Sequence, residues 1–234
     1  MRDSRAFRER QAKNRKTVLS DQQTFGLEKL IRIILVCTPW WVFPGNWVKV
    51  ATDKCNVFTR RVLIEAYVLA KVLIFWMLIA NGYSDHSWVT GLLLWLAIET
   101  LYALSGSVFL RDLWSAPFSY QRNLILTLMN YIEICLFFAA VYRYEEVNNT
   151  GGDSLFIINE NLKDKSGKLT SSQAIYFSFI TAATVGYGDI SPKDTFIQKL
   201  VIMQVLISLI IVVMFVANTA GKLGTGTLAR AAEE

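Results

Sequence analysis

The sequence has little of what metal centres, disulfide frameworks and enzyme active sites require. Its 234 residues include one histidine and three cysteines, and the cysteines are scattered, odd in number and without metal-ligand spacing. No arrangement of a nucleophile with a base is visible either. We therefore expect no organic cofactor, and a membrane-embedded enzyme that uses Glu65, Glu99 or His86 is the weakest of the functions considered.

Two sequence patterns are also absent. Seven basic residues occupy the first sixteen positions, but no apolar leader core follows them, so we expect no cleavable signal peptide. No apolar span carries a repeated Arg-x-x-Arg series, and voltage sensing through transferred charge needs several such charges in each subunit. We therefore predict weak intrinsic voltage dependence.

Apolar residues dominate the composition. They make up 53% of the chain, and the mean hydropathy is +0.34, which is too apolar for an ordinary soluble domain and indicates an integral membrane protein. The formal net charge is +5. Because the basic residues lie beside apolar spans, we assign them to the membrane surface, with anionic lipid at the basic arm, and we expect no nucleic-acid partner.

The order of apolar and polar stretches predicts an all-α membrane protein with four transmembrane helices. The predicted spans are Val62–Ala80, Trp88–Leu110, Leu124–Val141 and a final span that starts near Thr195 and has Leu200–Ala217 as its apolar body. Four spans and the basic arm place both termini in the cytoplasm. The predicted parts are the basic arm (1–26), an interfacial helix and cytoplasmic linker (27–61), two peripheral transmembrane helices (62–123), a module with the last two spans (124–217) and a short cytoplasmic tail (218–234).

The stretch Leu27–Phe43 has apolar residues at helical spacing, but Thr38-Pro39 interrupts it. Tryptophans, which favour the headgroup level, follow the interruption, and basic residues flank the stretch on both sides. Its uninterrupted part is too short for a hydrocarbon core of about 30 Å. We predict an amphipathic helix in the cytoplasmic interface; a short first span is the alternative.

The most informative stretch is Thr184-Val185-Gly186-Tyr187-Gly188-Asp189. Glycine takes positive φ without penalty, so Gly186 and Gly188 let the backbone alternate between the two hands. Successive carbonyls can then face one side. In the carbonyl-lined filter of K⁺ channels, which this motif resembles, four such chains around an axis stack rings of carbonyl oxygens that replace the water shell of a cation. The alternative is an ordinary glycine-rich turn, but two membrane-length apolar segments enclose this motif.

This motif, with the apolar-aromatic run Ser172–Ala183 before it and an apolar run after it, resembles the pore module of the tetrameric potassium channels over residues 124–217. The resemblance implies a K⁺-selective pore in a fourfold symmetric homotetramer. It also implies that Ser171–Ala183 is a re-entrant pore helix, for which Thr170 is a suitable N-cap. The residues implied to form the K⁺ filter are Thr184, Val185, Gly186, Tyr187 and Gly188. The carbonyls of the first four and the Thr184 hydroxyl are implied to hold the ions.

The chain departs from these relatives beside the filter. Many members have tryptophans in the pore helix that brace the filter tyrosine, and the comparable positions here are Tyr176 and Phe177. Tyr176 can still hydrogen-bond Asp189, whereas Phe177 has no polar group for Tyr187. A weakly selective cation channel is therefore the alternative within this class.

The final span departs from the relatives as well. It has no Gly or Pro from Leu200 to Ala217, and Ser208 lies near the expected position of a glycine hinge. An apolar constriction around Met214 or Phe215 could gate by dewetting, although core packing is the ordinary role of either residue.

Three charged residues, Lys71, Glu99 and Glu133, lie near the middle of the first three predicted spans. A charge at that depth costs at least about 2.5–3.5 kcal/mol on insertion scales. We therefore predict that Lys71 pairs with Glu99 or Glu133; the alternative is that each charge reaches water separately.

The function predicted from the sequence is passive K⁺ permeation across the plasma membrane. A non-conducting accessory subunit is the alternative from another class, but assembly alone would require neither Thr184 nor both glycines. The sequence does not reveal the gating stimulus, and it leaves open a regulatory domain or subunit outside this chain.

Overall fold

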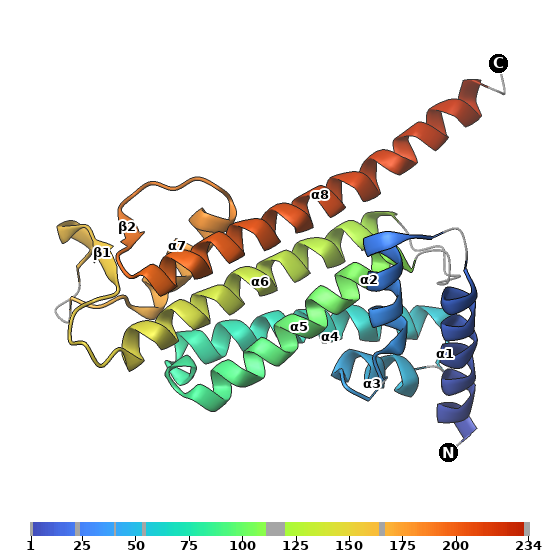
Figure 1. The fold of residues 1–234 in the computed structure, drawn as a ribbon, viewed down its shortest axis with the longest axis horizontal. Helices are drawn as coiled ribbons and strands as arrows, with labels where there is room; N and C mark the ends of the chain where they lie inside the picture. The colour runs from blue at the N-terminus through green and yellow to red at the C-terminus, as the bar shows by residue number, and fades with distance from the viewer. Residues whose placement is uncertain are drawn as a thin grey trace. The chain divides into compact units, whose positions relative to one another are not determined.

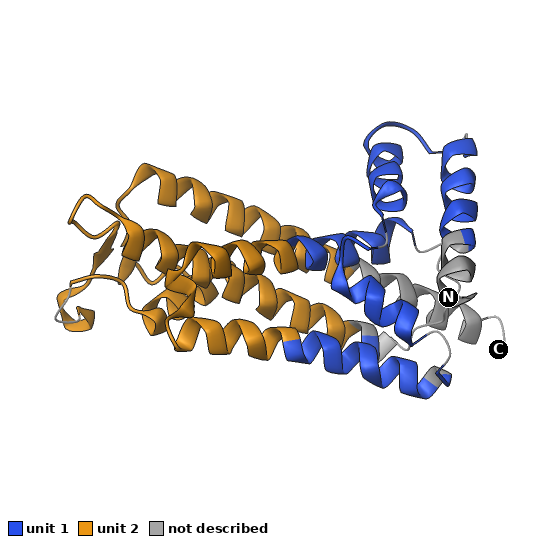
Figure 2. Cartoon of the chain, turned by 90° about the horizontal axis from the view of Figure 1, so that it is seen from below, with its two compact units in different colours: residues 1–70, 98–123 blue, residues 71–97, 124–234 orange. Residues whose placement is uncertain are grey.

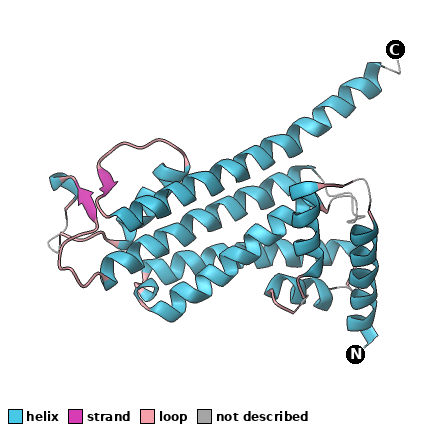
Figure 3. Ribbon diagram, in the orientation of Figure 1, coloured by secondary structure: helices cyan, strands magenta, loops and turns pink. Residues whose placement is uncertain are grey.

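The computed structural model describes residues 2–21, 24–39, 41–52, 55–110, 120–163 and 167–231. In these residues the chain is mainly helical, with one two-stranded sheet (Figure 3). The elements in chain order are α1 (Arg2–Ser20), α2 (Gly26–Cys37), α3 (Pro44–Ala51), α4 (Val57–Ala80), the 3₁₀ helix η1 (Tyr83–Asp85), α5 (Ser87–Phe109), α6 (Tyr120–Asn148), β1 (Phe156–Ile158), the 3₁₀ helix η2 (Glu160–Leu162), α7 (Ser171–Ala182), β2 (Ile190–Pro192) and α8 (Thr195–Ala231).

Four of these helices are long and apolar enough to cross a membrane, which confirms the predicted number. The candidate spans are Phe58–Ala80, Ser87–Phe109, Leu124–Asn148 and Thr195–Val216. The third is longer than expected, because α6 continues past Val141. Tyr142 and Glu146 in this extension are fully buried, so protein and not lipid surrounds their polar groups. Polar residues are tolerated at such positions, and the helix can therefore continue past Val141.

The chain forms two compact units (Figure 2). Unit 1 comprises residues 1–70 and 98–123, and unit 2 comprises residues 71–97 and 124–234. The division passes through α4 and α5, so each of these helices contributes one half to each unit.

Unit 1 contains the N-terminal helices. The basic arm expected at residues 1–26 includes the helix α1, which lies beside α2 (Figures 1 and 2). Val18 of α1, Leu35 of α2 and Leu110 form a small buried core. The Tyr102 hydroxyl donates to the Leu35 carbonyl at 2.9 Å, which fixes α2 against α5.

The amphipathic helix predicted over Leu27–Phe43 is shorter than expected, and a second short helix follows that stretch. α2 ends at Cys37, directly before Thr38-Pro39, and α3 begins at Pro44, where a proline is well tolerated because the first helical N–H has no partner in any helix. With 12 residues, α2 is about 18 Å long, shorter than a hydrocarbon core of about 30 Å. The length argues against a span, and the interfacial position stays a prediction.

Unit 2 is organised around α6. Residues 133–140 of α6 are all buried. After α6, the chain forms α7, α8 and the antiparallel pair β1–β2 (Figure 1). The rings of Tyr142, Phe156 and Phe177 form the aromatic part of this core, with centroids 5.2–5.9 Å apart. This core joins α6, β1 and α7, and it supports the segment in which the filter was predicted.

Candidate functional site

α7 is the short helix directly before the predicted filter. The Thr170 hydroxyl accepts a hydrogen bond from the Gln173 amide at 3.3 Å, and the Gln173 side chain accepts from the Thr170 amide at 2.8 Å. This reciprocal pair is a capping box, which satisfies two amides at a helix start. The helix predicted at Ser171–Ala183 is present and ends one residue earlier, at Ala182.

The predicted filter backbone alternates between the two hands. Positive φ occurs at Thr184 (57°), Gly186 (56°) and Gly188 (78°), while Val185 and Tyr187, which lie between them, do not have positive φ. Positive φ at the two glycines follows the sequence prediction, whereas positive φ at Thr184 was not predicted. It is the one residue other than glycine with positive φ in the described part of the chain. A β-branched residue in this region is strained, and such strain concentrates at functional sites.

Helix α7 anchors the start of this segment. The Val185 amide donates to the Ile180 carbonyl at 2.9 Å, and the Thr184 amide donates to the Thr181 carbonyl at 3.0 Å. The last carbonyls of α7 are therefore satisfied by the first residues of the predicted filter. A displacement of α7 would be passed on to Thr184 and Val185.

Asp189 anchors the other end. Its Oδ2 accepts from the Tyr176 hydroxyl at 2.6 Å, its Oδ1 accepts from the Ile190 amide at 3.0 Å, and its carbonyl accepts from the Asn159 amide at 2.9 Å. The hydrogen bond between Tyr176 and Asp189 is the one that the sequence analysis considered possible. Directly after Asp189, β2 pairs with β1, with Ile190 opposite Ile158. The segment 184–189, called the filter segment below after its predicted role, thus lies in the loop between α7 and β2 (Figure 1) and is held at both ends.

The segment itself lies open in a single chain. Val185 is 49% exposed and Tyr187 is 70% exposed. A Cβ added at Gly186 or Gly188 would meet nothing within 4 Å. One chain therefore builds only one wall of any site that this segment forms.

Phe177 lies away from this open side. It is 4% exposed, and its ring centroid is 5.2 Å from that of Tyr142 and 5.4 Å from that of Phe156. Phe177 therefore supports α7 from within the core of unit 2, while Tyr176 reaches the end of the filter segment.

The gate and hinge candidates lie on α8, which is helical from Thr195 to Ala231. Ser208 is 1% exposed, and no partner for its hydroxyl is found in the described part of the chain. Met214 and Phe215 are half-buried. The structure places these three residues on one continuous helix and does not test their role in gating.

Lys71 of α4 lies beside Glu133 of α6. The Lys71 Nζ is 3.1 Å from each carboxylate oxygen of Glu133, and both side chains are buried. Of the two partners that the sequence allowed, the structure therefore places Glu133 against Lys71. Glu65, the acidic residue of α4, pairs with Arg122 of α6 at 2.5 Å.

Glu99 has different partners, which sequence reasoning missed. Its Oε1 accepts from the Gly45 amide at 2.6 Å, and its Oε2 accepts from the Tyr67 hydroxyl at 2.8 Å. Gly45 is the second residue of α3, so the carboxylate lies at the positive end of a helix dipole. Burial lowers the pKa of Lys49, further along α3, and attraction to Glu99 opposes that shift. Glu99 thus joins α3, α4 and α5 within unit 1.

A side chain at position 45 should break this junction. A Cβ on Gly45 would overlap Glu99 Oε1, so we expect Gly45→Ala to destabilise the protein by about 1.5–3 kcal/mol, the usual worth of a hydrogen bond to a charged group. Thermal unfolding in detergent measures this. The matched control is Gly91→Ala in α5, where a Cβ meets nothing within 4 Å and helix propensity favours alanine. Equal melting temperatures of the two variants would contradict this reading of Glu99.

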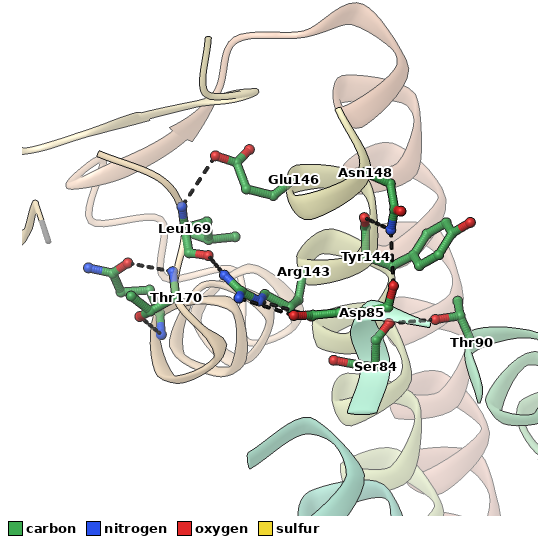
Figure 4. A network of polar contacts seen from close by, with 10 residues as sticks. Ser84, Asp85, Thr90, Arg143, Tyr144, Glu146, Asn148, Leu169 and Thr170 are labelled. Atoms are coloured by element: carbon green, nitrogen blue, oxygen red, sulfur yellow. Dashed lines mark hydrogen bonds and ion pairs between the residues drawn. The ribbon is translucent and has the colours of Figure 1, made fainter. Parts of the chain in front are cut away.

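A second polar network connects the η1 loop with the start of α7 (Figure 4). Arg143 of α6 donates to both carboxylate oxygens of Asp85, at 3.1 and 3.3 Å, and to the Leu169 carbonyl at 2.5 Å. The buried Glu146 accepts from the Leu169 amide at 3.3 Å. Leu169 directly precedes the cap residue Thr170, so its two backbone groups are fixed by α6. The loop between α4 and α5 is therefore linked to the helix that carries the filter segment.

The described residues contain no group of three or more His, Cys, Asp or Glu side chains that could hold a metal ion.

Residues 130–224 match the model of a protein family described as ion channel. The matched region contains most of α6, all of α7, the segment 184–189 and α8 up to residue 224. No curated protein and no solved structure matches the chain. The family match gives this part of the chain its similarity to ion channels and, with the four apolar helices, indicates a membrane protein. Potassium selectivity and fourfold assembly stay predictions.

Proposed function

We propose that the protein is a potassium-selective channel that works as a homotetramer. The observation that carries the proposal is the alternation of positive φ at Thr184, Gly186 and Gly188 within an ion channel module. An alternating backbone can turn successive carbonyls to one side, and the sequence TVGYG is the known carbonyl-lined filter of K⁺ channels. The K⁺ ligands would be the carbonyls of residues 184–187 and the Thr184 hydroxyl.

Assembly follows from the open side of the filter segment. One chain supplies one wall, and a closed ring of carbonyls needs identical copies around a rotation axis, which for this filter is fourfold. The exposed apolar face of α8 supports packing against other copies or lipid, because its large side chains are about half exposed. These are Ile202, Met203, Leu206, Leu209, Ile210 and Val213.

Electrostatics favour a cation beside the filter. α7 ends at Ala182, and the C-terminal end of a helix carries a partial negative charge. In a re-entrant arrangement, this end of α7 from each of four subunits would point toward the pore axis below the filter. The partial negative charges of the four helix ends would attract K⁺ into the pore, and no carboxylate side chain would be needed there.

The proposed location is the plasma membrane, with both termini in the cytoplasm. The basic arm at residues 1–26 would contact anionic lipid on that side. The two peripheral helices carry no arginine series, so current should depend weakly on voltage.

Cation flux into liposomes that contain the purified protein tests the proposal. We expect K⁺ flux that excludes Na⁺ and that Ba²⁺ blocks, from a protein with the mass of a tetramer, and no flux in protein-free liposomes. Equal K⁺ and Na⁺ flux would instead identify a weakly selective cation channel. If neither ion flows, and Phe215→Ala does not open the pore, the protein is a non-conducting subunit and the proposal is wrong.

A further inference from the structure

Behind the filter, three helices of unit 2 meet in a buried polar network. The Tyr142 hydroxyl of α6 donates to Gln204 Oε1 of α8 at 2.6 Å. Gln204 Nε2 donates to the Ser178 carbonyl of α7 at 2.8 Å and to the Ser178 hydroxyl at 2.9 Å. The Ser178 hydroxyl in turn donates to the Cys135 carbonyl of α6 at 2.6 Å. Tyr142, Ser178 and Gln204 are all fully buried.

The network is satisfied in one arrangement only. A glutamine amide has one acceptor oxygen and one donor nitrogen, and here the oxygen faces a phenol that can donate while the nitrogen faces two oxygens of Ser178. Turning the amide over would place its oxygen opposite the Ser178 carbonyl oxygen, so that two acceptors would face each other with no hydrogen between them. Buried networks of this kind are specific, because a partly satisfied one is costly in a low-dielectric interior. Gln204 therefore fixes the position of α8 relative to α7.

Close packing brings α7 to these neighbours. The buried face of α7 carries small residues at intervals of four, Ala174, Ser178 and Ala182, which let helix backbones approach. Ser178 lies two residues before Ile180, whose carbonyl binds the Val185 amide. The link from Gln204 to the filter segment thus runs through Ser178 and less than one turn of helix.

We propose that Gln204 is a positioning residue for ion selectivity, which it exerts by holding α7, and with it residues 184–188, in the ion-binding geometry. This inference rests on the proposed channel function. Because α8 has neither Gly nor Pro from Leu200 to Ala217, it has no flexible point next to Gln204. A movement of α8 at this level therefore reaches the filter through Ser178.

The test uses the full chain in liposomes and compares the K⁺/Na⁺ flux ratio of Gln204→Leu with that of the unchanged protein. A buried neutral hydrogen bond corresponds to about twofold to tenfold in an equilibrium constant, and the change occurs in four subunits, so we expect the ratio at low K⁺ to fall at least about tenfold. Tyr142→Phe removes a single hydroxyl and should give a smaller fall in a variant that folds readily.

High K⁺ should restore the ratio in both variants, because an ion that binds the intact filter stabilises that conformation by mass action. The control is Ile197→Val, a buried apolar position of α8, which should lower thermal stability and leave the ratio unchanged. An unchanged ratio in Gln204→Leu and Tyr142→Phe, or a loss that high K⁺ does not restore, would overturn the inference. If the unchanged protein passes no K⁺, the channel proposal itself fails, and this inference fails with it.

Discussion

Gly186→Ala should abolish K⁺ flux. Gly186 has a φ of 56°, and a side chain in left-handed backbone costs about 1–2 kcal/mol per residue. In a ring of four subunits the cost becomes about 4–8 kcal/mol, which corresponds to a loss of about 10³-fold or more in the population of the conducting backbone. Relief of the strain would rotate the carbonyls beside Gly186 away from the pore axis. Liposome flux measures the loss.

The matched control separates the filter from backbone strain in general. Gly152 also has positive φ, 78°, and a Cβ there would meet nothing within 4 Å. Gly152→Ala should therefore carry a similar strain outside the filter segment and keep its K⁺ flux. If Gly186→Ala conducted K⁺ as well as Gly152→Ala does, the alternating backbone would not be the conducting structure.

Lys71→Met should be strongly destabilising. It leaves the carboxylate of Glu133, which is fully buried, without its cation, and breaking a buried ion pair by removal of one partner costs about 3–5 kcal/mol. Glu133→Gln in the same chain removes the isolated charge, so the double variant should be more stable than Lys71→Met alone. The measurement is the thermal unfolding of each variant in detergent.

A second cycle with Glu99→Gln supplies the control. Glu99 binds the Gly45 amide and the Tyr67 hydroxyl, so its effect should add to that of Lys71→Met within about 0.5 kcal/mol. Additive effects in the Glu133 cycle, or strong coupling in the Glu99 cycle, would show that the ion pair is assigned to the wrong partner.

The sequence was sufficient for features that depend on neighbours along the chain. Hydropathy predicted four long apolar helices, and the hydroxyl-rich start at Thr170 predicted a capped helix before the motif. Both follow from local rules, since a span needs only length and apolarity and a cap needs only the first turn. Positive φ at Gly186 and Gly188 was also predictable from a local rule, because it depends on the residue type at each position.

The sequence was insufficient where partners lie far apart along the chain. The partner of Glu99 is an amide 54 positions away. It lies after Phe43, in the stretch that the sequence assigned to a cytoplasmic linker, because the pattern gave no sign that a helix begins at Pro44. For Lys71, depth in the membrane limited the partners to two carboxylates but could not decide which helix is adjacent.

Gln204 is a residue whose importance the sequence indicates only in part. In the run from Leu200 to Ala217 it and Ser208 are the two polar side chains, and a polar group in such a run usually has a protein partner. The pattern therefore marks Gln204 as unusual. It cannot show that the partner is Ser178 of α7, because that contact depends on how α7 packs against α8.

The most direct measurement is the reversal potential of the reconstituted protein in a planar bilayer, with K⁺ on one side and Na⁺ on the other. A carbonyl filter built on residues 184–188 predicts a potential close to that of a membrane permeable to K⁺ alone, and Gly152→Ala should give the same value. A reversal potential near zero, with currents carried equally by both ions, would contradict the account, because the motif would then be present without the selectivity that its backbone geometry supports.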